Sequence, residues 1–201
     1  MASRQKKPRA LFVTLVFGTW TVAVIVLGGI LTSYHQALRT PGEGILALAS
    51  TPSTPGWRAI HVLSGSCGCS QRVMRHLVSR PKFDGVTEQV VLVDDQESPL
   101  PGSSELISEL EVRGFLPKRV AVRDIPPGVG LRGVPLLVIA SPEDRIAYIG
   151  GYGDHSDQDV SIMQKVRSGA SASPLPIVGC AVGRSLRRSV DPFHLKYTRE
   201  N

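Results

Sequence analysis

The stretch that decides the fold is His61-Val-Leu-Ser-Gly-Ser-Cys67-Gly-Cys69-Ser-Gln-Arg-Val-Met-Arg-His-Leu77. An apolar run ends in a Gly/Ser turn, and the turn leads two thiols, one residue apart, into the start of a helical pattern. Val73, Met74 and Leu77 recur one helical turn apart and form the apolar face of that helix. The order of strand, loop, paired cysteines and helix is typical of thiol redox sites.

The two thiols lie where the helix begins. The positive end of the helix dipole and the unsatisfied N–H groups of the first turn favour a thiolate, the form that attacks a disulfide or binds a metal. Cys67 lies at or just before the first turn and is the candidate nucleophile, whereas Cys69 is the candidate resolving thiol. We expect both sulfurs to face solvent, because two thiols this close on a turn are poorly placed for packing.

Length and composition limit the function classes. The chain has 201 residues, enough for one domain of about 100 to 150 residues plus extra segments. Its three cysteines are too few for a disulfide framework, so they indicate chemistry rather than structural support. The net charge of +6 is concentrated near the two ends of the chain, which leaves a nearly neutral body and does not favour nucleic-acid binding.

An uncharged apolar run, residues 10–31, predicts one transmembrane helix. At about 1.5 Å per residue it is roughly 33 Å long, enough for a bilayer core of about 30 Å. Basic residues precede it in the tail 1–9 and only Arg39 follows it closely. The tail is therefore expected in the cytoplasm, and everything after the helix on the periplasmic or extracellular side. Cleavage as a signal peptide at Ala47-Leu-Ala49 is disfavoured, because that site is too far from the apolar run.

The rest of the chain divides into three segments. Residues 32–56 are rich in Thr, Pro, Gly and Ser and predict a linker with little capacity to bury a core. Residues 57–168 carry the patterns of a folded domain, and residues 169–201 form a C-terminal extension. The domain is expected to hold strands at 57–63, 86–93, 131–140 and 145–149 and helices at 67–79, 103–114 and 157–167. Its first strand, helix and strand form a βαβ unit, so these two strands should be parallel.

The last part of this domain has a strand that begins with Gly133-Val134-Pro135, then a charged hairpin and a Gly-Gly turn. Together with the cysteine pair on a helix, this order of elements resembles the thioredoxin-like superfamily. The resemblance implies an α/β fold in which helices flank a central mixed sheet. It also implies that Pro135 follows a cis peptide bond beside the cysteine loop, and that a substrate backbone pairs with Val134.

The cysteine spacing departs from the pattern of that family, in which two residues separate the cysteines and a Trp precedes the first. Here a single glycine separates Cys67 from Cys69, and a disulfide between them would close a small, strained ring. We therefore predict an easily reduced, oxidising couple that favours disulfide exchange or isomerisation.

The third cysteine, Cys180, lies in the C-terminal extension between an apolar and a basic run. The extension could fold back across the active-site face and bring Arg184, Arg187 or Arg188 near the thiolates. Two interpretations of Cys180 stay open: a third redox thiol that resolves an intermediate at Cys67 or Cys69, or a small buried apolar residue.

Two other function classes compete with redox catalysis. Cys-x-Cys is a good ligand pair for copper, and thioredoxin folds include membrane-tethered copper chaperones, so Cys67, Cys69 and His155 form an alternative metal site. A non-catalytic anchored scaffold is the third class. The chain lacks the sequence motifs of hydrolases and nucleotide-binding proteins.

The sequence as a whole favours a membrane-anchored, extracytoplasmic thiol-disulfide oxidoreductase or isomerase. Cys67 would attack, Cys69 would resolve the mixed disulfide, and Val134 with Pro135 would orient the substrate. The expected partners are protein thiols or disulfides outside the cytoplasmic membrane, and the chemistry requires no cofactor.

Overall fold

The computed structural model describes residues 7–35, 38, 40–49, 55–94, 99–115, 117–153, 155–191 and 197. The chain divides into two units, of which one is Met1–Gln36 with Phe193–Asn201 and the other is Ala37–Pro192. The first contains the helix α1 (Lys7–His35), and the second contains every other helix and strand described below.

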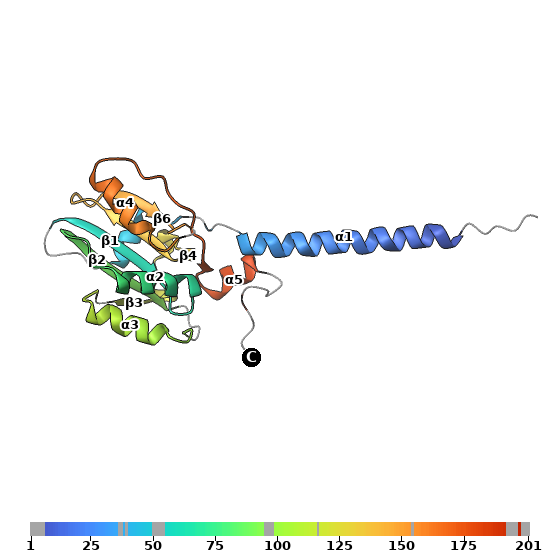
Figure 1. Ribbon diagram of the computed structural model, residues 1–201, viewed down its shortest axis with the longest axis horizontal. Coiled ribbons are helices and arrows are strands. Elements are labelled where there is room, and N and C mark those ends of the chain that lie inside the picture. Colours follow the sequence, from blue (N-terminus) through green and yellow to red (C-terminus); the bar gives the residue numbers. More distant parts are fainter. Residues whose placement is uncertain are drawn as a thin grey trace, which may run out of the picture. The chain divides into compact units, whose positions relative to one another are not determined.

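The helix α1, the long helix near the N-terminus in Figure 1, has the composition of a membrane-spanning segment. Its part Phe12–Leu31 is long and apolar enough to cross a bilayer, and both a membrane anchor and a signal sequence have this character. The hydroxyls of Thr19 and Thr21 each donate a hydrogen bond to the carbonyl four residues earlier. These hydroxyls therefore need no water, which suits a hydrocarbon environment.

A five-stranded mixed sheet forms the centre of the second unit, in the order β3-β2-β1-β5-β6. The strands are β1 (Trp57–Leu63), β2 (Val86–Asp94), β3 (Lys118–Ala121), β5 (Leu136–Ala140) and β6 (Ile146–Gly150). β1 pairs in parallel with β2 and antiparallel with β5, so the expected parallel βαβ unit and the expected mixed sheet are both confirmed.

Three helices cover one face of this sheet: α2 (Gly68–Ser79), α3 (Ser103–Val112) and α4 (Gln158–Arg167) (Figure 1). Successive side chains of a strand point to opposite faces, and β1 follows this rule. Ala59 and Leu63 pack in the helix-covered core, whereas Ile60 and Val62 pack in a second core on the other side.

Short irregular segments cover the second face. The 3-10 helix η1 (Glu43–Leu48) buries Ile45 completely and Leu48 almost completely, and Ile177 of the C-terminal extension is also fully buried there. The expectation that residues 32–56 bury little is therefore wrong for η1. The physical reason is that α2, α3 and α4 all lie on the other face, so the apolar side chains of this face need a different cover.

The strand expected at 131–140 is divided by Pro135. Gly133–Val134 forms β4, which leaves the large sheet and pairs antiparallel with β7 (Cys180–Ala181) of the extension. The last helix, α5 (Arg184–Val190), follows β7 directly. The extension is thus joined to the domain next to the cysteine loop.

We predict that Ile45→Ala lowers the free energy of unfolding by about 2 to 5 kcal/mol, because it leaves a cavity in the second core. Denaturant unfolding of the full chain in detergent measures this loss. Val112→Ala, at a side chain that is 89% exposed on α3, is the matched control and should change stability by less than about 0.5 kcal/mol. Equal stability of both variants would show that η1 does not belong to the core.

Candidate functional site

Cys67 lies at the junction between β1 and α2. Cys67 is the N-cap residue of α2 and has an extended backbone. Its carbonyl accepts the first hydrogen bond of the helix, from Gln71 N–H at 3.0 Å. The predicted position at the helix N-terminus is therefore confirmed. The predicted exposure is wrong for Cys67, which is fully buried, because the C-terminal extension lies over it.

A disulfide joins Cys67 to Cys180, with a Cα–Cα distance of 5.9 Å. Cys180 is half-buried in β7, opposite Val134 of β4 in the strand register. Cys69 is a free thiol in this structure. The disulfide thus joins Cys67 to the third cysteine rather than to its neighbour. Of the two interpretations of Cys180 that the sequence left open, this pairing favours the redox thiol.

The structure brings the predicted substrate-orienting residues to the same place. The Val134–Pro135 peptide bond is cis, as the resemblance implied, and both residues are buried. The sulfur of Cys67 lies 3.7 Å from the carbonyl oxygen of Val134. Cys67, Val134, Pro135 and Cys180 therefore form one cluster.

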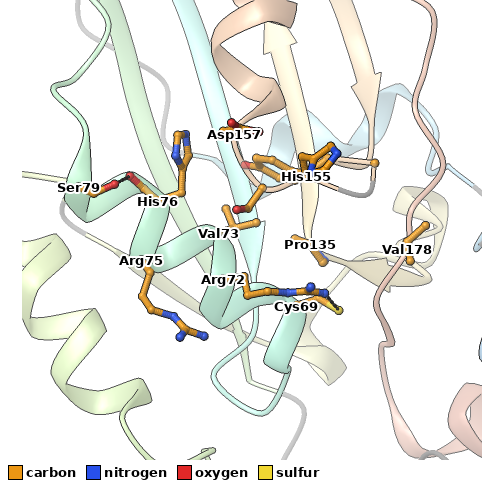
Figure 2. Close-up of a pocket in the computed structure, with 13 residues that line it drawn as sticks. Cys69, Arg72, Val73, Arg75, His76, Ser79, Pro135, His155, Asp157 and Val178 are labelled. Atoms are coloured by element: carbon orange, nitrogen blue, oxygen red, sulfur yellow. Dashed lines mark hydrogen bonds between the residues drawn. The ribbon is translucent and has the colours of Figure 1, made fainter.

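Cys69 lies two residues after Cys67, in the first turn of α2, and lines a pocket (Figure 2). Its half-buried sulfur accepts a hydrogen bond from the Arg72 guanidinium at 3.2 Å. It lines an open pocket of about 550 Å³, whose other walls include Pro135, Tyr152 and Val178. The pocket reaches Cys69 from solvent, whereas Cys67, its neighbour in the loop, is fully buried in the disulfide with Cys180.

The alternative copper ligands do not form a cluster in this disulfide-bonded form. His155 is exposed and lines the same pocket as Cys69, but the sulfur of Cys67 is bonded to Cys180. Among the described residues, no group of three or more His, Cys, Asp and Glu side chains is arranged to hold a metal ion. Copper binding by Cys67, Cys69 and His155 stays a prediction.

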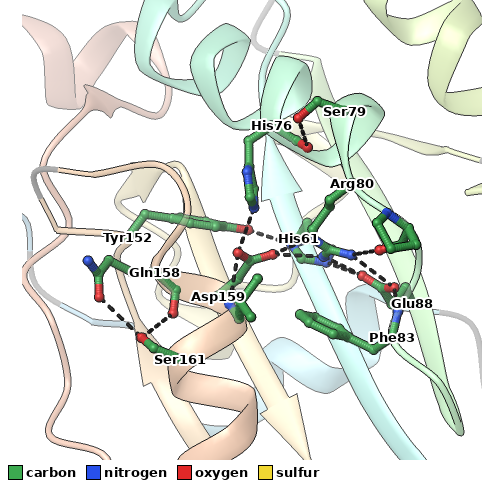
Figure 3. Close-up of polar contacts among 12 residues, drawn as sticks. His61, His76, Ser79, Arg80, Phe83, Glu88, Tyr152, Gln158, Asp159 and Ser161 are labelled. Carbon is green, nitrogen blue, oxygen red and sulfur yellow. Dashed lines mark hydrogen bonds and ion pairs between the residues drawn. The ribbon is translucent and has the colours of Figure 1, made fainter.

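A buried ion-pair cluster holds the far end of α2 (Figure 3). Arg80, the residue after this helix, donates hydrogen bonds to Glu88 of β2 at 2.6 Å and to Asp159 of α4 at 2.7 Å. Burial raises the pKa of Glu88, but hydrogen bonds from His61 and Arg80 outweigh it and lower this pKa to about 2. Burial alone would lower the pKa of Arg80. Its carboxylate partners Glu88 and Asp159 outweigh burial, so the pKa of Arg80 is raised above its usual value.

Two histidines complete this cluster. His61 is fully buried on β1, where its ring bonds Glu88 at 3.3 Å and the hydroxyl of Tyr152. His76 of α2 bonds Asp159 at 2.8 Å. Burial raises the pKa of Tyr152 well above its usual value. Tyr152 also lines the pocket of Cys69, so the cluster reaches the candidate site through this ring.

Sequence reasoning missed the cluster of Arg80, Glu88 and Asp159. The available signal was Glu88, a charged residue inside an apolar strand pattern. Buried charges are normally paired, so such a residue indicates a buried partner without saying which one. Arg80 lies 8 positions from Glu88 and 79 positions from Asp159 along the chain, so no local pattern links the three residues.

These observations define the class of the protein. The mixed sheet, the cysteine at the N-terminus of α2 and the neighbouring cis proline make a thioredoxin-like fold. A cysteine pair at disulfide distance in this position supports a redox role. One N-terminal helix is apolar enough to be a membrane anchor or a signal sequence.

The chain is similar to several solved structures. An uncharacterized conserved protein from Geobacillus kaustophilus is similar over 65% of this chain and 78% of its own, with 14% identity and a TM-score of 0.50. A hypothetical protein from Sinorhizobium meliloti 1021 covers 73% of this chain and 90% of its own, with 13% identity and a TM-score of 0.49. StoA from Bacillus subtilis is similar over 56% of this chain and 85% of its own, with 10% identity and a TM-score of 0.40. No protein-family model and no curated protein sequence matches the chain.

We predict that Glu88→Gln makes the protein less stable at neutral pH and flattens its acid denaturation. An unperturbed glutamate has a pKa of 4.5 and folded Glu88 has a pKa of about 2. The stability from this carboxylate is therefore present above about pH 4.5 and is lost as the pH falls towards 2, with a size of about 3 kcal/mol. Urea unfolding at several pH values measures it.

Glu105→Gln, at an exposed position of α3, is the matched control and should keep the acid dependence of the wild type. If Glu88→Gln loses stability between pH 4.5 and 2 as steeply as this control does, the buried cluster is not the source of the effect.

Proposed function

We propose that the protein is a membrane-anchored, extracytoplasmic thiol-disulfide oxidoreductase or isomerase. The observation that carries the proposal is the Cys67–Cys180 disulfide at the N-terminus of α2, beside Val134 and Pro135. This position gives the sulfur of Cys67 the surroundings that favour a thiolate, both as an attacking and as a leaving group.

Reduction of the disulfide follows from the burial of its two sulfurs. Cys180 is half-buried and Cys67 is fully buried, so an external protein dithiol reaches Cys180 first. One of its thiolates attacks the Cys180 sulfur, and Cys67 leaves as a thiolate at the helix N-terminus. The second external thiol then displaces Cys180. Two electrons and two protons have moved from the dithiol, now a disulfide, to Cys67 and Cys180.

The reduced protein can run the reverse reaction. The Cys67 thiolate attacks a substrate disulfide, one substrate sulfur leaves as a thiolate, and the other stays joined to Cys67. Either Cys180 or Cys69 then attacks the Cys67 sulfur and releases the second substrate thiol. The observed bond supports Cys180 in this role, and the place of Cys69 two residues away on α2 supports it as the predicted alternative.

The sidedness of the protein is part of the proposal. Lys6, Lys7 and Arg9 precede the apolar span, and the positive-inside rule places such residues in the cytoplasm. The domain would then lie outside the cell membrane. A disulfide persists in that oxidising compartment, whereas cytosolic reductants would open it.

We predict that Cys67→Ser abolishes disulfide exchange between the full-length protein and a protein dithiol. Cys180→Ser should lower the rate by more than about tenfold because it removes one half of the disulfide. Cys69→Ser should leave the Cys67–Cys180 bond intact, and mass spectrometry after differential alkylation shows this. The exchange rate of this variant tells whether Cys69 or Cys180 resolves the intermediate.

Ser66→Ala is the control for a general disturbance of the loop and keeps all three sulfurs. Full activity of Cys67→Ser would overturn the proposal. One copper atom per chain, retained after reduction and lost in Cys67→Ser and in His155→Ala, would instead favour the copper-binding alternative.

A further inference from the structure

We propose that the strand around Cys180 is a built-in substrate mimic, and that the groove beneath it binds extended protein segments in which glycine precedes the reacting cysteine. The inference rests on the proposed function and deepens it by naming the substrate class. Its groove is formed by β4 and the Cys67 loop, and its present occupant is the segment Val178–Ala181.

The occupant is held as a bound peptide strand would be. Cys180 lies opposite Val134 and Ala181 lies opposite Gly133 in an antiparallel pair. The next residue continues this pairing, since Val182 N–H donates to the Arg132 carbonyl at 2.9 Å. Backbone pairing provides affinity for an added strand without regard to its sequence, and pockets for alternate side chains provide the selectivity.

The selectivity lies at Gly179, the residue before the cysteine. A Cβ atom there would lie 2.0 Å from the Val134 carbonyl oxygen and 2.7 Å from Cδ of Pro135. Both obstacles belong to rigid parts of the groove, so a side chain at this position would push the strand away from β4. The groove therefore excludes every residue except glycine before the cysteine.

The two flanking positions have different requirements. Val178 is 43% exposed and borders the pocket of Cys69, so this position tolerates different side chains. Ala181 is fully buried, so the position after the cysteine accepts a small residue. The substrate segment that fits is thus any residue, then glycine, the reacting cysteine and a small residue.

The segment before the occupant is fixed to the domain by separate contacts. Gly151 N–H donates to the Leu175 carbonyl at 2.8 Å, and the carbonyl of fully buried Ile177 accepts a hydrogen bond from Leu38 at 3.3 Å. After the occupant, Arg187 donates to the Ala181 carbonyl and to Ser66. The occupant is therefore tethered at both sides and stays close to the groove when its disulfide is open.

This tether supplies a route for product release. A substrate segment enters when Cys67 and Cys180 are reduced, and the Cys67 thiolate forms a mixed disulfide with its cysteine while the other substrate sulfur leaves as a thiolate. The Cys180 thiolate then attacks the Cys67 sulfur, and the substrate cysteine leaves as a thiolate. The occupant returns to β4, the substrate disulfide has gained two electrons, and the Cys67–Cys180 bond has formed again.

Two peptides test the inference on the full-length Cys180→Ser protein. One has the sequence Ile-Val-Gly-Cys-Ala-Val, the other has alanine in place of glycine, and each cysteine carries thionitrobenzoate as a leaving group. We expect the glycine peptide to form the mixed disulfide with Cys67 at least about tenfold faster, a difference of about 1.4 kcal/mol in the barrier. The symmetric aromatic disulfide of thionitrobenzoate measures the basal reactivity of Cys67.

The outcomes separate the inference from the proposed function. Equal rates for the two peptides, or reaction of Cys67 with the small disulfide alone, overturn the inference and leave the function standing. A Cys67 that reacts with none of the three overturns the function as well.

The same inference is tested within the chain. Gly179→Ala should shift the Cys67–Cys180 bond towards the dithiol in a redox buffer by at least about tenfold. Gly128→Ala, where a Cβ meets no atom within 4 Å, should leave the equilibrium unchanged. An unchanged equilibrium in Gly179→Ala would overturn the inference.

Discussion

The pairing of β4 with β7 is the interaction on which the site depends. It brings a strand from the end of the chain against the two residues before Pro135, and this register places Cys180 at bonding distance from Cys67. The segment that contains this strand also covers part of the second core, through buried Ile177 and Val182. The helices α2, α3 and α4 leave one face of the sheet without a cover, so the extension packs on that face. This packing also determines which cysteine forms a disulfide with Cys67.

The helix α2 is held at both of its ends, and this fixes the position of Cys67. Its N-terminus is bonded to the extension through the disulfide, and its C-terminal side is anchored by Arg80 to Glu88 of β2 and Asp159 of α4. Breaking one partner of a buried ion pair costs about 3 to 5 kcal/mol, so the charged end is a strong anchor. The cysteine end can open by thiol exchange while the charged end stays in place, which keeps the helix N-terminus aligned for the next reaction.

Local patterns were sufficient to predict much of this molecule. The apolar spacing of Val73, Met74 and Leu77 predicted α2, and the resemblance to the thioredoxin-like superfamily implied the cis peptide bond before Pro135. Contacts between distant segments were harder to predict. The sequence left the role of Cys180 undecided, and it did not indicate the burial of Ile45 or the ion pairs of Arg80. Each of these contacts depends on how segments that are far apart in the sequence pack together around the sheet. The spacing of apolar residues, every 2 residues in a strand or every 3.6 in a helix, does not indicate which distant segments come into contact.

The Cys67–Cys180 disulfide closes a long loop of the chain, so its redox state affects stability. Cross-linking residues 113 positions apart restricts the unfolded chain, and a loop of this size is worth about 5 kcal/mol in the loop-closure estimate. Reduction removes that contribution and leaves the strand held by backbone pairing and by its buried Ile177. Because this contribution comes from the unfolded chain, its loss lowers the stability of the whole folded unit. A reductant that opens the bond would therefore also loosen the strand that occupies the groove.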